Sequence, residues 1–275
     1  MAAAFLVTLR EGLEAALIVG IIAAYLVRIG RRDVLPAVAA GVGGALALSI
    51  LAGAVVFATV GRLPELVQAS IEGGAGLVAV GVLTWMLFWM RRQGRAIKGN
   101  LERGIDLALS GGSTTALVGL AFVAVAREGL ETVLFLFAVS SAAGTGPSTA
   151  LAGVAGLLVA AGIGWAIFAG GVRVNLRLFF GVTGAVLVFV SAGLIAFAIH
   201  EFGEAGLFVN AGRTFDLSAV LPETSPLGTI LSGLFGYRSA PTPPELLGYL
   251  VYLLPTFVMF VVDPVPPRRS SSAPA

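Results

Sequence analysis

The chain has no cysteine, one histidine and four methionines among its 275 residues. The absence of thiols excludes disulfides, thiolate metal sites and a cysteine nucleophile. Because imidazole and thioether groups are so few, a site for a soft metal is disfavoured as well. The sequence also lacks a GxxxxGK[ST] phosphate-binding motif, so no nucleotide site is expected to drive whatever this chain does.

Charge is the second scarce feature. Charged residues make up 12% of the chain, about half the share of a soluble domain. The net charge is +2, and no basic cluster is interleaved with aromatic residues, which excludes a nucleic-acid surface. Instead the chain is 57% hydrophobic with a mean hydropathy of +0.98, and several apolar runs reach the roughly 20 residues that cross a bilayer. The sequence predicts an all-α polytopic protein of the cell membrane (plasma or inner membrane), in contact with the lipid bilayer.

Seven apolar runs are long enough to be transmembrane helices. They lie at about 3–28, 34–60, 66–90, 115–141, 149–171, 177–200 and 246–262. The segments that connect them divide the basic residues unevenly. One side receives twelve: Arg28, Arg31, Arg32, Arg91, Arg92, Arg95, Lys98, Arg103, Arg173, Arg177, Arg268 and Arg269. The other side receives Arg62, Arg213 and Arg238. The positive-inside rule then predicts that the N-terminus lies outside and the C-terminus inside.

The remaining segments are connections rather than further domains. The external loop 201–245 is mildly acidic and contains five prolines, so it is too short and too broken for a catalytic domain. The end of the chain, residues 263–275, is rich in proline and serine and is expected to be a disordered cytoplasmic tail. We therefore expect one integral membrane domain over residues 1–262.

The pentapeptide REGLE occurs twice, and each copy lies inside an apolar run. Arg10 begins the first copy and Arg127 the second, 117 residues later and three spans further on. Because three is an odd number, the second copy must cross the membrane in the opposite direction. A shorter AGV-x-G match, at 40–44 and 152–156, follows one span later in each half. The pattern predicts an inverted 3+3 repeat (repeat A about 3–90, repeat B about 115–200) plus one extra helix, a design typical of secondary transporters.

The two motifs concentrate charge where it is costly. On a helix the glutamates of each copy lie at i and i+3, and the arginine lies at i−4 from the second glutamate, so all share a face. Each charge costs about 2.5–3.5 kcal/mol at a helix centre and should face the bundle interior. Four carboxylates and two guanidinium groups leave two negative charges in excess, which suits a hard cation. The candidate metal ligands are Glu11, Glu14, Glu128 and Glu131, and the candidate charge-balancing residues are Arg10 and Arg127.

Other polar residues in or near the spans give weaker signals. Glu72 lies inside the third span and could extend an access route, or it could reach the membrane surface as a structural residue. His200, Glu201 and Glu204 end the sixth span and could collect cations, or could simply form a solvated helix end. Trp85 and Trp89 are expected to be interface-belt or packing residues.

These residues resemble the oxidase-dependent iron permeases, the family of fungal high-affinity iron permeases and their bacterial EfeU-type relatives. The likeness rests on Arg-Glu-x-x-Glu at 10–14 and at 127–131, on IEGG at 71–74, on AIHEF at 198–202 and on LFGYRSAPTPPELLGYLVYLLP at 234–255. It covers essentially the whole chain. The resemblance implies seven spans and import of ferric iron (Fe³⁺), with the motif glutamates as ligands. It also implies a separate oxidase or peroxidase and an iron-binding partner outside the membrane, since this chain has no ferroxidase domain.

Three alternatives to a ferric-iron permease stay open at this stage. A carrier for a divalent cation (ferrous iron, manganese or lead) would use the same oxygen ligands. A non-transporting membrane subunit could use each REGLE as a structural ion pair. An intramembrane hydrolase is disfavoured, because the only histidine stands at a span end. We therefore expect a transporter rather than an enzyme, with no bound organic cofactor, and the sequence leaves the oligomeric state open.

Overall fold

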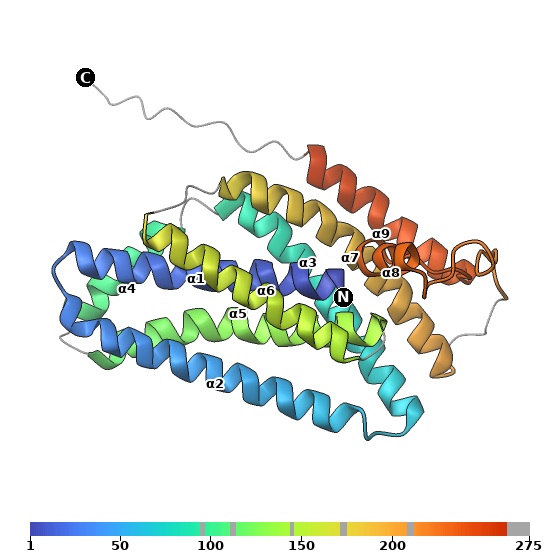
Figure 1. The fold of residues 1–275 in the computed structure, drawn as a ribbon, viewed down its shortest axis with the longest axis horizontal. Coiled ribbons are helices and arrows are strands. Elements are labelled where there is room, and N and C mark those ends of the chain that lie inside the picture. The colour runs from blue at the N-terminus through green and yellow to red at the C-terminus, as the bar shows by residue number, and fades with distance from the viewer. Residues whose placement is uncertain (94–96, 111–113, 144–145, 171–174, 208–211, 263–275) are drawn as a thin grey trace.

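The structure is a computed structural model that describes residues 1–93, 97–110, 114–143, 146–170, 175–207 and 212–262. Within these ranges all regular structure is helical (Figure 1). The helices are α1 (Ala2–Arg28), η1 (Arg32–Val34), α2 (Leu35–Val60), α3 (Glu65–Gln93), α4 (Ile97–Ser110), α5 (Thr114–Ala143), α6 (Pro147–Phe168), α7 (Leu176–Glu204), α8 (Pro226–Phe235) and α9 (Pro243–Val262). The predicted tail, 263–275, lies outside the described residues.

The long helices follow the apolar runs of the sequence. In hydrocarbon every backbone amide needs an internal partner, so an apolar run of this length is stable as a helix. Among the described residues, five helices are long and apolar enough to cross a membrane: α2, α3, α6, α7 and α9. Helices α1 (27 residues) and α5 (30 residues) are also long enough to cross a membrane, but each carries the three charges of a REGLE motif. The all-helical polytopic class is thus confirmed, and seven crossings remain a prediction.

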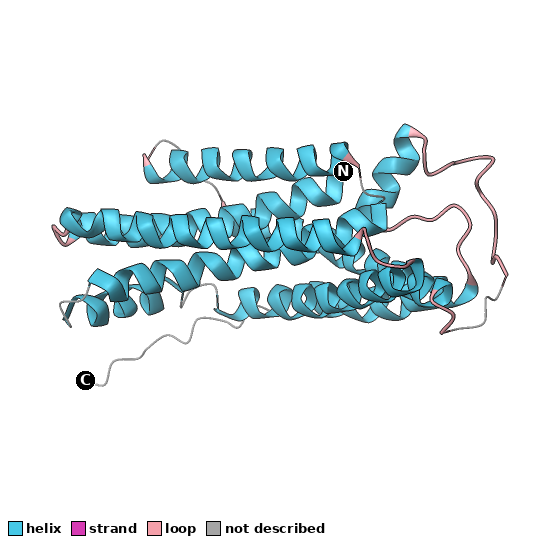
Figure 2. Cartoon of the chain, turned by 90° about the horizontal axis from the view of Figure 1, so that it is seen from below, coloured by secondary structure: helices cyan, strands magenta, loops and turns pink. Residues whose placement is uncertain are grey.

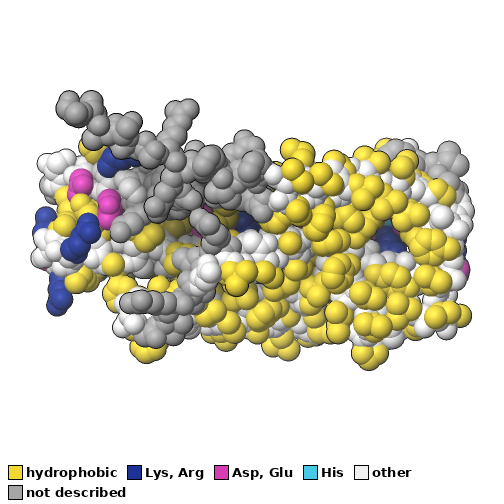
Figure 3. Space-filling model, turned by 90° about the horizontal axis from the view of Figure 1, so that it is seen from above, with side chains coloured by type: hydrophobic (Ala, Val, Ile, Leu, Met, Phe, Trp, Pro, Cys, Tyr) yellow, Lys and Arg dark blue, Asp and Glu magenta, His cyan; other side chains and the backbone are white. Residues whose placement is uncertain are grey.

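The outer surface of the bundle is apolar. Large hydrophobic side chains of α2 and α6 point outward, among them Ile50, Leu51, Leu151 and Leu158. Figure 3 shows apolar side chains over much of one face, with most of the visible basic and acidic side chains at one end. A soluble protein rarely exposes so large an apolar area. This surface fits contact with lipid.

The helices that carry the motifs lie at the centre of the packing. Helix α1 packs against α6 and α5, and α5 also packs against α2. Figure 1 shows that α1 and α6 run in one direction while α5 and α2 run in the other. Helix α3 packs against α7, which in turn packs against α9. The first helix of each predicted repeat therefore packs on the second helix of the other.

Close helix approach occurs at the glycine inside each motif. A Cβ on Gly12 would lie 2.8 Å from the Cβ of Ala160 in α6. A Cβ on Gly129 would lie 2.9 Å from the Cβ of Ser49 in α2 and would also overlap the Ser49 hydroxyl. Small residues at such contacts let membrane helices approach closely. This brings the backbone of each motif against a neighbouring helix.

A leucine at Gly12 is expected to disrupt the α1–α6 contact, because its side chain would need space that Ala160 occupies. Overpacking of this kind costs about 1–3 kcal/mol or more. We expect Gly12→Leu to lower the thermal midpoint of the purified protein by several degrees. Gly20→Leu is the matched control on the same helix, since a Cβ on Gly20 meets nothing within 4 Å. Equal midpoints for the two variants would contradict this packing.

Two helices, α4 and α8, lie in segments that the sequence identified only as connections. Leu101, Ile105 and Ala108 of α4 pack against the ends of α1, α2 and α5, and Tyr25 of α1 donates a hydrogen bond to Asp106 at 2.6 Å. Helix α8 begins at Pro226, and the side chain of the preceding Ser225 caps it by accepting a hydrogen bond from the Gly228 amide. Figure 2 shows the loops between α7 and α9 together at one end of the molecule. The two short helices therefore cover opposite ends of the motif helices.

Candidate metal centre

The first motif lies on the buried face of α1. Arg10 Nε lies 3.1 Å from Glu14 Oε1, and Arg10 Nη1 lies 3.8 Å from Glu11 Oε1. The Arg10 and Glu11 side chains are only 2% and 0% exposed. Nearby apolar residues, Leu9 and Leu13, pack with α6. The i, i+4 spacing thus forms the expected Arg10–Glu14 ion pair, and Glu11 lies further from the guanidinium than Glu14 does.

The second motif repeats this arrangement on α5. Arg127 Nε donates a hydrogen bond of 2.8 Å to Glu131 Oε1, and the same nitrogen lies 3.9 Å from Glu128 Oε1. Glu128 is buried and Glu131 is nearly so. In each copy the arginine pairs with the second glutamate and stays further from the first.

Three of the four predicted carboxylates converge. One oxygen each from Glu11, Glu128 and Glu131 lies within 4.8 Å of the others. Glu14 is not a member of this group and stays with Arg10. Both oxygens of Glu11 and one oxygen each of Glu128 and Glu131 are buried with no hydrogen-bond partner among the described residues. An oxygen-only group of this kind can hold a hard cation between α1 and α5.

The two arginines differ in the residues of α3 that they contact. Arg10 is buried, and its Nη2 donates to the Met90 sulfur at 3.1 Å. The Arg127 side chain is 39% exposed, and its guanidinium carbon lies 5.7 Å from the ring centre of Trp85 and 5.3 Å from that of Trp89. The sequence does not point to these contacts, because they join helices far apart in the chain. The i, i+4 spacing of the tryptophans shows only that they share a face.

The weaker candidates lie apart from the carboxylate group. Glu72 accepts a hydrogen bond from Gln68 at 2.8 Å, within α3. Glu201 lies where α7 packs against Gly73 of α3, and Glu204 is exposed at the end of α7. These glutamates therefore lie at one end of the α3–α7 pair, away from the motifs.

His200 has a partner that the sequence did not suggest. Its Nδ1 lies 2.9 Å from Glu245 Oε1, in the first turn of α9. The other Glu245 oxygen lies 3.8 Å from Arg238 Nε and accepts from the Thr242 amide at 3.3 Å. Glu245 is buried, so this network ties α7 to α9 and to the preceding loop. Sequence spacing does not indicate this pairing, because His200 and Glu245 are 45 residues apart in the chain.

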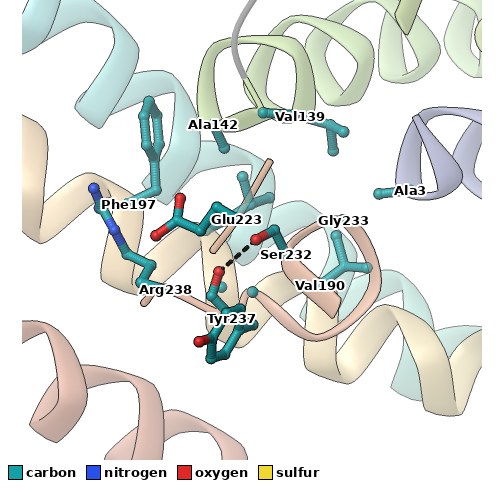
Figure 4. Close-up of a pocket in the computed structure, with 14 residues that line it drawn as sticks. Ala3, Val139, Ala142, Val190, Phe197, Glu223, Ser232, Gly233, Tyr237 and Arg238 are labelled. Carbon is teal, nitrogen blue, oxygen red and sulfur yellow. Dashed lines mark hydrogen bonds between the residues drawn. The ribbon is translucent and has the colours of Figure 1, made fainter. Parts of the chain in front are cut away.

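A cavity of about 100 Å³ lies at the end of the bundle that the long loop covers. Figure 4 shows Ala3 of α1, Val139 and Ala142 of α5 and the polar residues Glu223 and Arg238 around it. The cavity thus lies beside the first turn of α1 and the last turns of α5. It is on the same two helices as the carboxylates, nearer their ends.

Comparison with known proteins gives one consistent result. The model of the "Iron permease FTR1 family" matches residues 1–266. Proteins described as "Ferrous iron permease EfeU" are 44% identical over 273 residues in Escherichia coli O6:H1 and 43% identical over 272 residues in Yersinia pestis. These alignments cover 98% of this chain, and 97% and 95% of the two relatives. No solved structure matches. The chain therefore belongs to the iron permease FTR1 family and is a multi-pass protein of the cell membrane.

Proposed function

We propose that this iron permease imports ferric iron through a site formed by the carboxylates of Glu11, Glu128 and Glu131, with Glu14 as a fourth ligand once Arg10 releases it. The observation that carries the proposal is the group of three carboxylate oxygens within 4.8 Å, buried between α1 and α5. The iron is cargo, so the site binds it and releases it without chemical conversion. No enzymatic step belongs to this chain in the proposal.

The unpaired oxygens favour a cation site over a purely structural ion-pair cluster. A cluster that only locks helices together should satisfy its buried carboxylates, because an unpaired buried charge is costly. Here both oxygens of Glu11 lack a hydrogen-bond partner within the described part of the chain. The two motifs together carry four acidic and two basic residues. A bound cation would compensate the excess negative charge.

The choice between Fe³⁺ and Fe²⁺ as cargo rests on the ligand atoms, on the membrane potential and on the comparison with relatives. Carboxylate oxygen is a hard ligand, and no thiolate or imidazole belongs to the group, which favours a hard, highly charged ion. A trivalent ion would also gain roughly 7 kcal/mol from an inside-negative potential of about 100 mV. The curated relatives, however, are named ferrous iron permeases. Ferrous iron is therefore the second candidate, and it would occupy the same group.

In the proposal the permease is one membrane domain that crosses seven times, with the N-terminus outside. The pairing of α1 with α6 and of α5 with α2 supports the inverted repeat, since an inverted repeat exchanges equivalent helices in this way. Helix α9 stands outside the two repeats. The orientation rests on the basic residues of the sequence, of which Arg95, Arg173, Arg268 and Arg269 lie outside the described residues.

Iron would arrive from the end of the bundle that α8 and the long loop cover. That end holds the cavity beside Ala3 and Val139, which Glu223 and Arg238 also line. Glu72 and Glu201 on the nearby α3–α7 pair, with His200 and Glu204, would form the wider acidic approach. A separate oxidase or peroxidase and an iron-binding protein on that side would deliver the ion.

The test is uptake of radioactive iron by proteoliposomes that contain the purified permease. Chelated ferric iron and ferrous iron kept reduced are supplied separately, with an imposed inside-negative potential or with none. The proposal expects uptake of ferric iron that rises with the potential and exceeds uptake of ferrous iron. Faster uptake of ferrous iron would favour the second candidate. No uptake of either ion by correctly inserted protein would overturn the permease mechanism proposed here.

A further inference from the structure

The Arg127 guanidinium has two sets of partners at once. On one side its Nε donates to Glu131 at 2.8 Å. On the other, Trp85 and Trp89 stack on each other with ring centres 5.7 Å apart and an angle of 24° between the planes. The guanidinium carbon lies within 6 Å of both ring centres, the range of a cation–π interaction. Arg127 therefore lies between a carboxylate of the metal group and an aromatic pair.

Iron binding at the proposed site would change the contacts of the Arg127 guanidinium. When Glu131 gives its oxygens to a cation, the guanidinium loses its closest anionic partner and faces a like charge. An arginine without a partner is costly in a membrane interior. The two indole rings are the contacts on α3 that remain, and a desolvated cation–π interaction is among the stronger ones. Arg10 differs, because the contact that α3 makes with it in the described part of the chain is the Met90 thioether.

We propose that Trp85 and Trp89 are positioning residues that retain the Arg127 guanidinium when iron displaces it from Glu131. The aromatic pair thus sets how readily iron displaces the internal counter-ion. This inference rests on the proposed cation site. It assigns to two tryptophans, expected from the sequence to be belt or packing residues, a role in iron affinity that they exert through Arg127.

The exposure of these residues fits a role beyond core packing. The Trp85 side chain is 54% exposed, so it is not buried in the core. Its ring nevertheless lies against the Arg127 guanidinium, whose side chain is 39% exposed. A belt tryptophan needs only the membrane interface. The contact with Arg127 adds a specific partner.

The experiment is a double-mutant cycle on the affinity for iron, measured by equilibrium dialysis of the purified full-length permease. Trp89→Leu and Trp89→Phe are compared in the wild-type background and in Arg127→Gln. Loss of the cation–π contact is expected to weaken iron binding by about three- to tenfold in Trp89→Leu. Trp89→Phe retains a ring and should lose less. In the Arg127→Gln background neither change should matter, because the guanidinium is absent. Trp165→Leu, on the exposed face of α6 and far in sequence from the motifs, is the control.

Two outcomes would overturn the inference. The first is a weakening by Trp89→Leu that is equal in both backgrounds, which would show that the ring acts on folding and not through Arg127. The second is an iron affinity of Trp89→Leu and of Trp85→Leu equal to that of Trp165→Leu. A Glu11→Gln variant in the same series separates this failure from a wrong binding site: if Glu11→Gln binds iron as the wild type does, the proposed function fails as well.

Discussion

Iron uptake is expected to fall by at least about 100-fold at low iron concentration when Glu11 is replaced by Gln, because one carboxylate contributes about 4 kcal/mol per unit of cation charge at an effective dielectric constant of 20. Glu11 is fully buried, and both of its oxygens lack a hydrogen-bond partner among the described residues. The substitution keeps the shape of the side chain and removes its charge. The variant should therefore still fold, and the substitution should lower iron uptake rather than stability.

The companion variants make this prediction specific. Glu131→Gln should show a similar loss, since its oxygen belongs to the same group of three. Glu14→Gln should lose less, because Glu14 pairs with Arg10 and lies outside that group. Glu65→Gln, at an exposed glutamate of α3, is the matched control for removal of one negative charge. Uptake by proteoliposomes at the wild-type rate in a well-inserted Glu11→Gln variant would show that this carboxylate is not a ligand.

Replacement of Arg10 by Met is expected to destabilise the fold more than replacement of Arg127 by Met. Arg10 is 2% exposed, so its removal leaves buried carboxylates without a counter-ion, which costs about 3–5 kcal/mol. Arg127 is 39% exposed and lies over two tryptophan rings, so its replacement disturbs less enclosed packing than that of Arg10. The thermal midpoints of the two purified variants should differ in that order.

A second substitution tests whether charge is the cause. Arg10→Met combined with Glu14→Gln removes the arginine together with its partner at 3.1 Å, and it should recover much of the lost stability. If the double variant is as unstable as the sum of the two single variants, lost packing around Arg10 is the cause instead of an uncompensated charge.

The long helices were predictable because lipid permits few alternatives. The run predicted at 34–60 is α2, Leu35–Val60, and the run at 115–141 is α5, Thr114–Ala143. Hydropathy alone carries this information, since an apolar segment in a bilayer must satisfy its backbone internally. Helices α4 and α8 were not predictable in the same way. Helix α4 carries charge on one face, and α8 is a ten-residue helix in a proline-rich loop, so their stability depends on packing against the ends of α1 and α5.

The candidate site was predictable in composition but not in detail. Identical REGLE motifs pointed to the six residues, and helical spacing paired each arginine with the second glutamate. The choice of Glu11, Glu128 and Glu131 as the converging set depends on how α1 and α5 are rotated toward each other, which no local pattern encodes. The Met90 and tryptophan contacts of the arginines are likewise set by the path of α3.

X-ray absorption spectroscopy of the iron-loaded, purified permease tests the proposed carboxylate site, because it reports the atoms bound to iron. We expect iron to be bound by oxygen atoms alone, with one tightly bound iron per chain, and this bound iron should be lost in a Glu11→Gln, Glu131→Gln double variant. An unchanged spectrum and stoichiometry in that variant, or bonds from iron to sulfur or to several imidazole nitrogens, would contradict the proposed carboxylate site.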